Sequence, residues 1–165
     1  MIEVRIASLA VDPRSNQPVI VLKPLVEEPG QGRLLPIWIG HPEATAILLA
    51  LEGAEPSRPL THDLMRNMLE TLGSYVERVE ITRVEDGTFF AALVLRAEER
   101  SIAVDARPSD SIALAIRMGA PLFVAEDVLD SSSIADESDG VRDEEAELEA
   151  FRDFLDSVEP EDFQS

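Results

Sequence analysis

The stretch that says most about the fold is residues 101–117, which read SIAVDARPSDSIALAIR. Its first part places Ile102 and Val104 at alternate positions, as in a half-buried strand. A proline and two short polar residues then give the signals of a helix start. Strand-to-helix junctions expose backbone N–H groups and gather polar side chains at a sheet edge. The stretch therefore predicts a strand and a helix with three charged side chains between them, Asp105, Arg107 and Asp110.

The rest of the chain is long enough for one domain with a real core, since it has 165 residues of which 45% are hydrophobic. The formal charge of −19 is unevenly spread. Residues 126–165 hold sixteen acidic residues against two arginines, a net charge of −14, and residues 1–125 carry only −5. This charge disfavours a passive nucleic-acid coat, so nucleic-acid chemistry would need a local basic patch or bridging metal ions.

Cysteine is absent, which excludes disulfides, thiolate metal sites and a cysteine nucleophile and fits a cytosolic protein. The first residues alternate charged and apolar side chains, unlike a secretion signal. No apolar run approaches the roughly 20 residues that a membrane span needs. We therefore expect a cytoplasmic protein with no membrane contact.

Hydrophobic periodicity and turn signals predict an α+β fold with a mixed, largely antiparallel sheet. Glycine and proline positions delimit the helices. The expected strands are Ile2 to Val11, Pro18 to Leu22, Leu34 to Ile39, Val76 to Val84, Phe89 to Arg96, Ile102 to Val104 and Pro121 to Val124, and the expected helices are Glu43 to Glu52, His62 to Leu72 and Ser109 to Met118. The first helix, apolar nearly all round, is expected to be buried on most sides.

A weak internal repeat relates two of the strand-to-helix junctions. Pro42 precedes a Gly-Ala pair by eleven residues, and Pro108 precedes another by the same distance. Each follows an apolar strand and opens a helix rich in alanine, leucine and isoleucine. The match suggests a duplicated strand-helix unit, in which His41 and Glu43 correspond to Arg107 and Ser109. Chance similarity between two helix starts is the alternative.

The acidic end of the chain is predicted to be separate from the domain of residues 1–130. Residues 131–165 begin with a serine run that indicates a mobile connector. Further apolar residues fit one amphipathic helix with its acidic side in water, and disorder fits as well. These residues are Val141, Leu148, Phe151, Phe154, Leu155 and Val158.

Three separated motifs resemble the bifunctional nuclease family, also called the domain of unknown function 151 family. They are LPIWIG at residues 35–40 continuing to Glu43 and Ala44, RPLTHDL at 58–64, and DARPSDSIALA at 105–115. The likeness covers roughly residues 1–130, and the acidic tail is similar to that of actinobacterial members. The resemblance implies a nuclease acting on DNA and RNA, because plant relatives are described as having both activities. It carries over no settled catalytic residues.

Phosphodiester hydrolysis needs a nucleophilic water, charge stabilisation at the phosphoryl group and help for the leaving oxygen. Asp105, Asp110 and Glu43 are candidate ligands for Mg²⁺ or Mn²⁺, if the two junctions meet. Arg107 is a candidate phosphate clamp. Ser109 is a further candidate contact at the helix start, and the two imidazoles are candidate acids or bases. The predicted catalytic residues are Asp105, Arg107, Asp110 and His62, and the predicted substrate contacts are Arg107, Ser109 and His41.

The same residues also fit purely structural roles. Ser109 and Asp110 suit a helix start, and Arg107 suits a structural ion pair with a neighbouring aspartate. Both histidines fit turn or first-turn positions. Trp38 fits a core or interface position better than a base-stacking surface, because no basic aromatic stripe surrounds it. No phosphate loop, nucleophile elbow or HExxH helix is present.

The leading functional hypothesis is a metal-assisted nuclease without strong sequence preference. Its rival is a non-catalytic interaction or regulatory module whose acidic tail binds a basic protein partner. The apolar edge around Trp38 and the apolar first helix predict a homo-oligomer, most simply a homodimer.

Overall fold

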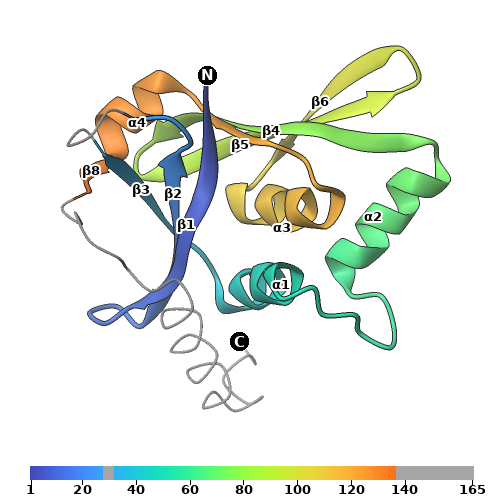
Figure 1. Cartoon of the computed structure of the whole chain (residues 1–165), viewed down its shortest axis with the longest axis horizontal. Helices are drawn as coiled ribbons and strands as arrows, with labels where there is room; N and C mark the ends of the chain where they lie inside the picture. The colour runs from blue at the N-terminus through green and yellow to red at the C-terminus, as the bar shows by residue number, and fades with distance from the viewer. Residues whose placement is uncertain (28–31, 137–165) are drawn as a thin grey trace.

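The computed structural model describes residues 1–27 and 32–136 of the chain (Figure 1). Every helix and strand predicted within these residues is present, with ends shifted by a few residues. The elements are β1 (Ile2–Asp12), β2 (Gln17–Pro24), β3 (Arg33–Trp38), α1 (His41–Leu51), α2 (Thr61–Thr71), β4 (Ser74–Glu85), β5 (Thr88–Ala97), β6 (Arg100–Ala106), α3 (Pro108–Met118), β7 (Leu122–Val124), α4 (Glu126–Ser132) and β8 (Ile134–Ala135).

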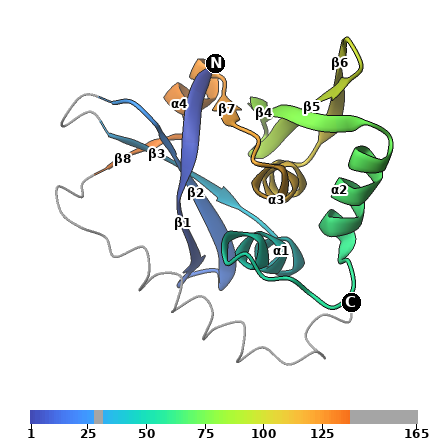
Figure 2. The ribbon, with the colours of Figure 1, turned by 45° about the vertical axis from the view of Figure 1, so that its right-hand side comes forward.

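The strands form one sheet in the order β6-β5-β4-β7-β1-β2-β3-β8. Every pair of neighbours is antiparallel except β4 and β7. The fold is therefore α+β with a mixed, largely antiparallel sheet, as predicted. Figure 1 shows β1–β3 and β4–β6 running across one another, with α3 and α1 in the angle between them. Figure 2 shows α3 stacked on α1 and α2 standing to one side.

The chain repeats one arrangement: three antiparallel strands followed by an eleven-residue helix. The first copy is β1-β2-β3-α1 and the second is β4-β5-β6-α3. In the sheet the two strand triplets lie on opposite sides of β7, each with its first strand next to β7. The predicted strand-helix repeat is thus part of a larger duplication, and its two helices pack against each other.

The core lies between the sheet and the helices and draws on both copies. Ile20 and Leu22 of β2 are fully buried, as are Val79 of β4 and Ile112 of α3. Because these side chains belong to a single hydrophobic cluster, the copies share one core.

Two helices present faces that differ from those predicted. Only Ala44, Ile47 and Leu48 of α1 are buried, so α1 buries one side rather than most of its surface. In α2, helical spacing would turn Leu64, Met68 and Leu72 toward the core and Asp63 toward water. The structure is the reverse, because His62 and Asp63 are buried and those three apolar residues are exposed. The reason is an ion pair between Asp63 and Arg117, which turns the start of α2 toward α3.

The structured part of the chain continues past the expected boundary at residue 130. In place of a mobile connector, residues 126–132 form α4, and β8 pairs with β3. Two ion pairs join this segment to the sheet: Arg33 to Asp130 and Lys23 to Asp136. The expected amphipathic helix falls at residues outside the described ones. Among the described residues, no helix is long and apolar enough to cross a membrane.

Several apolar side chains are exposed, including Trp38, the outer row of α2, and Ile102 and Val104 of the edge strand β6. Exposed apolar surface of this kind is typical of interfaces. The homodimer stays a prediction.

The side chain of Arg117 forms hydrogen bonds to residues of α1, α2 and α3. Its Nε donates to Oδ1 of Asp63 over 2.6 Å, and its Nη1 donates to the carbonyl oxygens of Ala46 and Ala113. Its side chain is only 6% exposed. A buried guanidinium is tolerated only when its donors are satisfied, so this residue fixes how the three helices meet.

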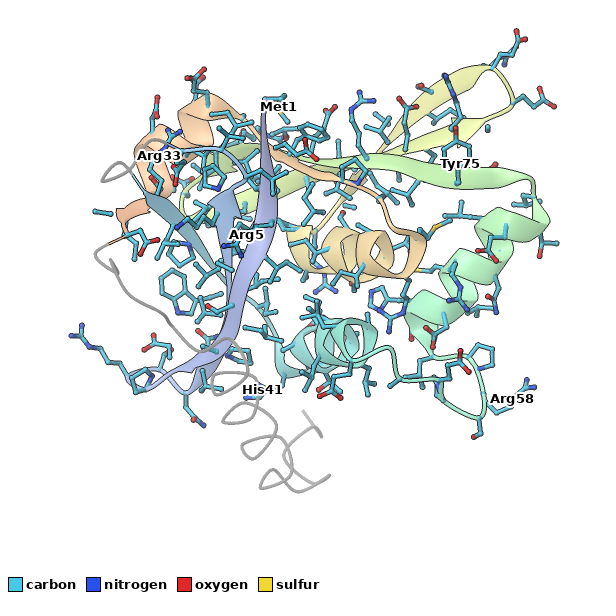
Figure 3. The ribbon with its side chains drawn as sticks, viewed as in Figure 1. Met1, Arg5, Arg33, His41, Arg58 and Tyr75 are labelled. Atoms are coloured by element: carbon cyan, nitrogen blue, oxygen red, sulfur yellow. The ribbon has the colours of Figure 1, made fainter. Side chains whose placement is uncertain are left out.

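Replacing Arg117 with Met should lower the free energy of unfolding by about 3 kcal/mol or more, because it leaves the Asp63 carboxylate buried without its cation. Chemical denaturation measures this loss. Adding Asp63→Leu to Arg117→Met should restore part of the stability, since no buried charge remains. The control is Arg58→Ala in the exposed loop before α2 (Figure 3), expected to change stability by less than about 0.5 kcal/mol. Equal effects of Arg117→Met and Arg58→Ala would contradict this role.

Candidate functional site

The first turns of α1, α2 and α3 meet at one place, and each brings an ionisable side chain. Glu43 comes from α1, His62 from α2 and Asp110 from α3, and Arg107 is the residue that caps α3. The local sequence explains the positions: Pro42 and Pro108 suit the first turn of a helix, where no backbone N–H partner is needed.

Arg107 is the centre of this cluster. Its Nε donates to Oδ2 of Asp110 over 2.7 Å, and its Nη2 donates to Oε1 of Glu43 over 2.9 Å. The other carboxylate oxygen of Asp110 lies 3.1 Å from Nε2 of His62. The result is a continuous chain of contacts, Glu43–Arg107–Asp110–His62, which we call the junction cluster. It joins both copies of the repeat and α2.

The charge states of the junction cluster follow from these contacts. Burial raises the pKa of the Asp110 carboxyl, but hydrogen bonds from Arg107 and His62 outweigh it, so that pKa lies below its usual value. The hydrogen bond to Asp110 also raises the pKa of Arg107. Asp110 is therefore a carboxylate and Arg107 a cation at neutral pH.

A cavity of ≈ 540 Å³ opens beside the cluster. Its walls include Glu43, Thr45, Leu49, Leu60, His62 and Asp110. Arg107 lies at its edge with its side chain 64% exposed. Helix N-termini carry partial positive charge, so three of them beside an arginine favour an anion here in spite of the chain's net charge.

Gly40 allows the carboxylate of Glu43 to reach Arg107. This carboxylate folds back over the start of α1, and a Cβ at residue 40 would collide with its Oε2. A larger residue at position 40 would therefore displace Glu43.

The structure brings together Glu43, Arg107, Asp110 and His62 of the predicted site residues. Asp105 lies elsewhere: it is exposed on β6, opposite Ala92, which in turn pairs with Glu80. Strand alternation puts this side chain on the face of the sheet away from the helices, whereas the expectation followed closeness in sequence. Among the described residues, no hydrogen bond or ion pair to Asp105 is found.

The other two predicted contacts also differ in placement. Ser109 is buried, with only 6% of its surface exposed, and lines a second cavity on the other side of Arg107. It does not cap α3, because Arg107 occupies the capping position. His41 begins α1 at the lower rim of the view in Figure 3 and is not among the described residues that line either cavity.

The donor set limits what metal this site can hold. Within residues 1–27 and 32–136, no three or more His, Asp and Glu side chains are grouped to hold a metal ion. The expected trio of Glu43, Asp105 and Asp110 is therefore not assembled. The described residues therefore do not form an all-protein metal cage.

The positioning pair Asp63 and Arg117 was not anticipated. Asp63 follows His62 directly, accepts from the backbone N–H of Leu60 over 2.9 Å and binds Arg117, so it fixes the first turn of α2. A usable signal exists in the sequence: Arg117 follows Asp110 by seven residues, which places both near one side of α3.

The free energy of unfolding should fall at acidic pH, in part because the carboxylate of Asp63 becomes protonated. Hydrogen bonding to Arg117 holds the pKa of Asp63 below its usual value of 3.8. Its folded-state pKa is thus lower than its unfolded-state pKa, so its contribution is present above about pH 4 and is lost as the pH falls through the folded-state value. The stability gap between wild type and Asp63→Asn, measured by denaturation, should therefore shrink as the pH falls. A gap that is constant with pH would contradict the assignment, and Asp105→Asn is the exposed control.

Comparison with known proteins places the chain in a family. Residues 24–137 match the model of the bifunctional nuclease domain. An uncharacterized protein of Mycobacterium tuberculosis is 46% identical over 170 residues, which cover 99% of this chain and 98% of that protein.

Plant proteins are more distantly similar. Bifunctional nuclease 1 of Arabidopsis thaliana is 31% identical over 110 residues, which are 65% of this chain and 33% of that protein. Bifunctional nuclease 2 of the same plant is 32% identical over 108 residues, 64% of this chain and 32% of that protein. The chain thus spans about a third of the plant proteins' length. The domain match, which spans more than half of the chain, shows that this chain belongs to the bifunctional nuclease domain family.

Proposed function

We propose that the chain hydrolyses phosphodiester bonds of DNA and RNA at the junction cluster. The observation that carries the proposal is the exposed guanidinium of Arg107, held between two carboxylates where three helix N-termini meet, in a chain of this family. Family membership supports a nucleic-acid substrate, and the remaining N–H donors of Arg107 beside the helix N-termini support a phosphate at this place.

Arg107 is proposed to bind the scissile phosphate. Two of its five N–H groups donate to Asp110 and Glu43, and within the described part of the chain the other three have no acceptor. The carboxylates fix the plane of the guanidinium, so the remaining donors can meet phosphoryl oxygens with little loss of side-chain entropy. As negative charge develops on these oxygens, the interaction strengthens.

His62 is proposed as the acid or base, with Asp110 as the residue that orients it. A proton on Nε2 is the one that Asp110 can accept, which leaves Nδ1 as the basic ring atom. The His62 side chain is 9% exposed and lines the cavity, where it can take a proton from water or give one to the leaving oxygen.

Mg²⁺ or Mn²⁺ is proposed as an assisting ion. Glu43 and Asp110 would hold it, together with water and substrate oxygens. Such an ion would stabilise charge on the phosphoryl group. Both carboxylates form ion pairs with Arg107. Binding of a metal ion would therefore compete with these ion pairs for the carboxylate oxygens.

Matched variants should show whether cleavage depends on the junction cluster or on residues of β6. Asp110→Asn and Arg107→Ala should each lower the rate of cleavage by about 100-fold or more, the usual cost of losing one transition-state donor or its support. Asp105→Asn should cleave like the wild type, because Asp105 lies outside the cluster. The assay uses end-labelled single- and double-stranded DNA and RNA with Mg²⁺, Mn²⁺ or chelator, and thermal unfolding shows that each variant is folded.

Two results would count against this proposal. If Asp105→Asn fails as Asp110→Asn does, the chemistry lies at the β6 edge. If the wild type cleaves no substrate under any of these conditions, the hypothesis of a non-catalytic interaction module is favoured over the nuclease. Capture of a basic protein partner by the full chain would then support that hypothesis.

A further inference from the structure

We infer that the second cavity beside Arg107 is a subsite for one unpaired nucleotide, with Trp38 as the surface on which its base stacks. This inference rests on the proposed function, since it extends the same site along a nucleic-acid strand. The cavity measures ≈ 380 Å³, and we call it the Trp38 cavity. Arg107 lines both cavities, so a strand bound at the junction cluster continues directly into this one.

The walls of the Trp38 cavity come from four places in the sequence. The end of β3 supplies Trp38, the start of β5 supplies Thr88 and Phe89, and the start of α3 supplies Ser109. Gln17 of β2 completes a lining of apolar, aromatic and neutral hydrogen-bonding groups. Among the described residues that line this cavity, Arg107 alone carries a charge. This combination suits a heteroaromatic base beside one phosphate.

Trp38 is exposed but held in place. It is 51% exposed, and its indole N–H donates to Oδ2 of Asp12 over 3.2 Å. Asp12 is itself fixed by the hydroxyl of Ser15 and by the backbone N–H of Arg14. A half-exposed indole in a fixed orientation offers a flat surface, and stacking on it costs little conformational entropy.

Ser109 gives an independent indication of a ligand. Ser109 is 6% exposed, lines the Trp38 cavity and, within the described part of the chain, makes no side-chain hydrogen bond. Its Oγ is not among the fully enclosed polar atoms that lack a partner, so it is within reach of a polar ligand in this cavity. Ser109 lies in the first turn of α3, where backbone N–H groups also favour a phosphate or sugar oxygen.

The geometry favours a single strand over a duplex. A base that stacks on Trp38 must leave its own stack and its pairing partner, which costs least in an unpaired strand. Arg107 is the single cation at the Trp38 cavity, too little charge to hold the two phosphate backbones of a duplex. The ligand class is therefore single-stranded DNA or RNA.

The test uses Trp38 as its own reporter, because the chain has one tryptophan. A phosphorothioate-linked oligothymidylate octamer, which resists cleavage, is titrated into the full-length protein with chelator present. Saturable quenching of the tryptophan fluorescence is expected. An octamer of the same backbone without bases should bind more weakly and quench less.

Variants then assign the contact. Trp38→Ala should weaken binding of the base-carrying strand by about 5- to 100-fold and Trp38→Phe by much less, as measured by anisotropy of a labelled strand. Trp38→Ala should bind the baseless strand as the wild type does. Ser109→Ala should weaken both strands alike, by about 2- to 10-fold. The matched control is Tyr75→Ala, because Tyr75 is an aromatic residue that is 52% exposed, like Trp38, but lies at the start of β4 outside the lining of the Trp38 cavity (Figure 3).

The outcomes separate this inference from the proposed function. If Trp38→Ala binds base-carrying strands as tightly as the wild type, while Arg107→Ala loses binding and cleavage, the base subsite is wrong and the nuclease site stands. If the wild type neither binds nor cleaves any strand, the proposed function fails and the subsite fails with it.

Discussion

The buried ion pair between Arg117 and Asp63 is the interaction on which the site depends. Arg117 also holds a carbonyl of α1 and one of α3, so a single side chain sets the mutual position of three helices. Asp63 adjoins His62, and the pair therefore fixes where the imidazole stands relative to Asp110. A buried pair adds little net stability compared with apolar residues, but it permits one geometry only. Here that geometry brings three helix N-termini to one point.

This convergence is the reason that we propose a phosphate site in a chain of net charge −19. The field that a phosphate meets is local: an exposed arginine and the N-terminal turns of three helices act over a few ångströms, and more distant acidic groups are screened by salt. Arg107 lies between two cavities, so one side chain is placed to contact a strand both at the proposed point of cleavage and in the proposed base subsite. The duplication supplies the framework, since Glu43 and Arg107 come from equivalent junctions of its two copies.

Much of the fold follows from local signals. Proline and glycine positions located the helices, alternation located the strands, and the spacing of Pro42 and Pro108 revealed the repeat. Sequence also identified four residues of the cluster, Glu43, His62, Arg107 and Asp110. It misplaced Asp105 because closeness in sequence was weighed above strand alternation. It missed the burial of Asp63 because that burial depends on Arg117, which is 54 residues away. The pattern around Asp63 does not indicate such a long-range pairing, and the one hint lies in α3, where Arg117 follows Asp110 by seven residues.

The most direct test of the account is a titration of the isotopically labelled protein with a thymidine dinucleotide, followed by nuclear magnetic resonance. A phosphate bound at the junction cluster should give the largest shifts at the Nε–H of Arg107 and at backbone N–H groups in the first turns of α1, α2 and α3, with smaller shifts at the indole N–H of Trp38. Residues of β6 near Asp105 should stay unchanged. Shifts concentrated on β6 or on the exposed apolar row of α2, with none at Arg107, would contradict the central claim that the phosphate is bound where the three helices meet.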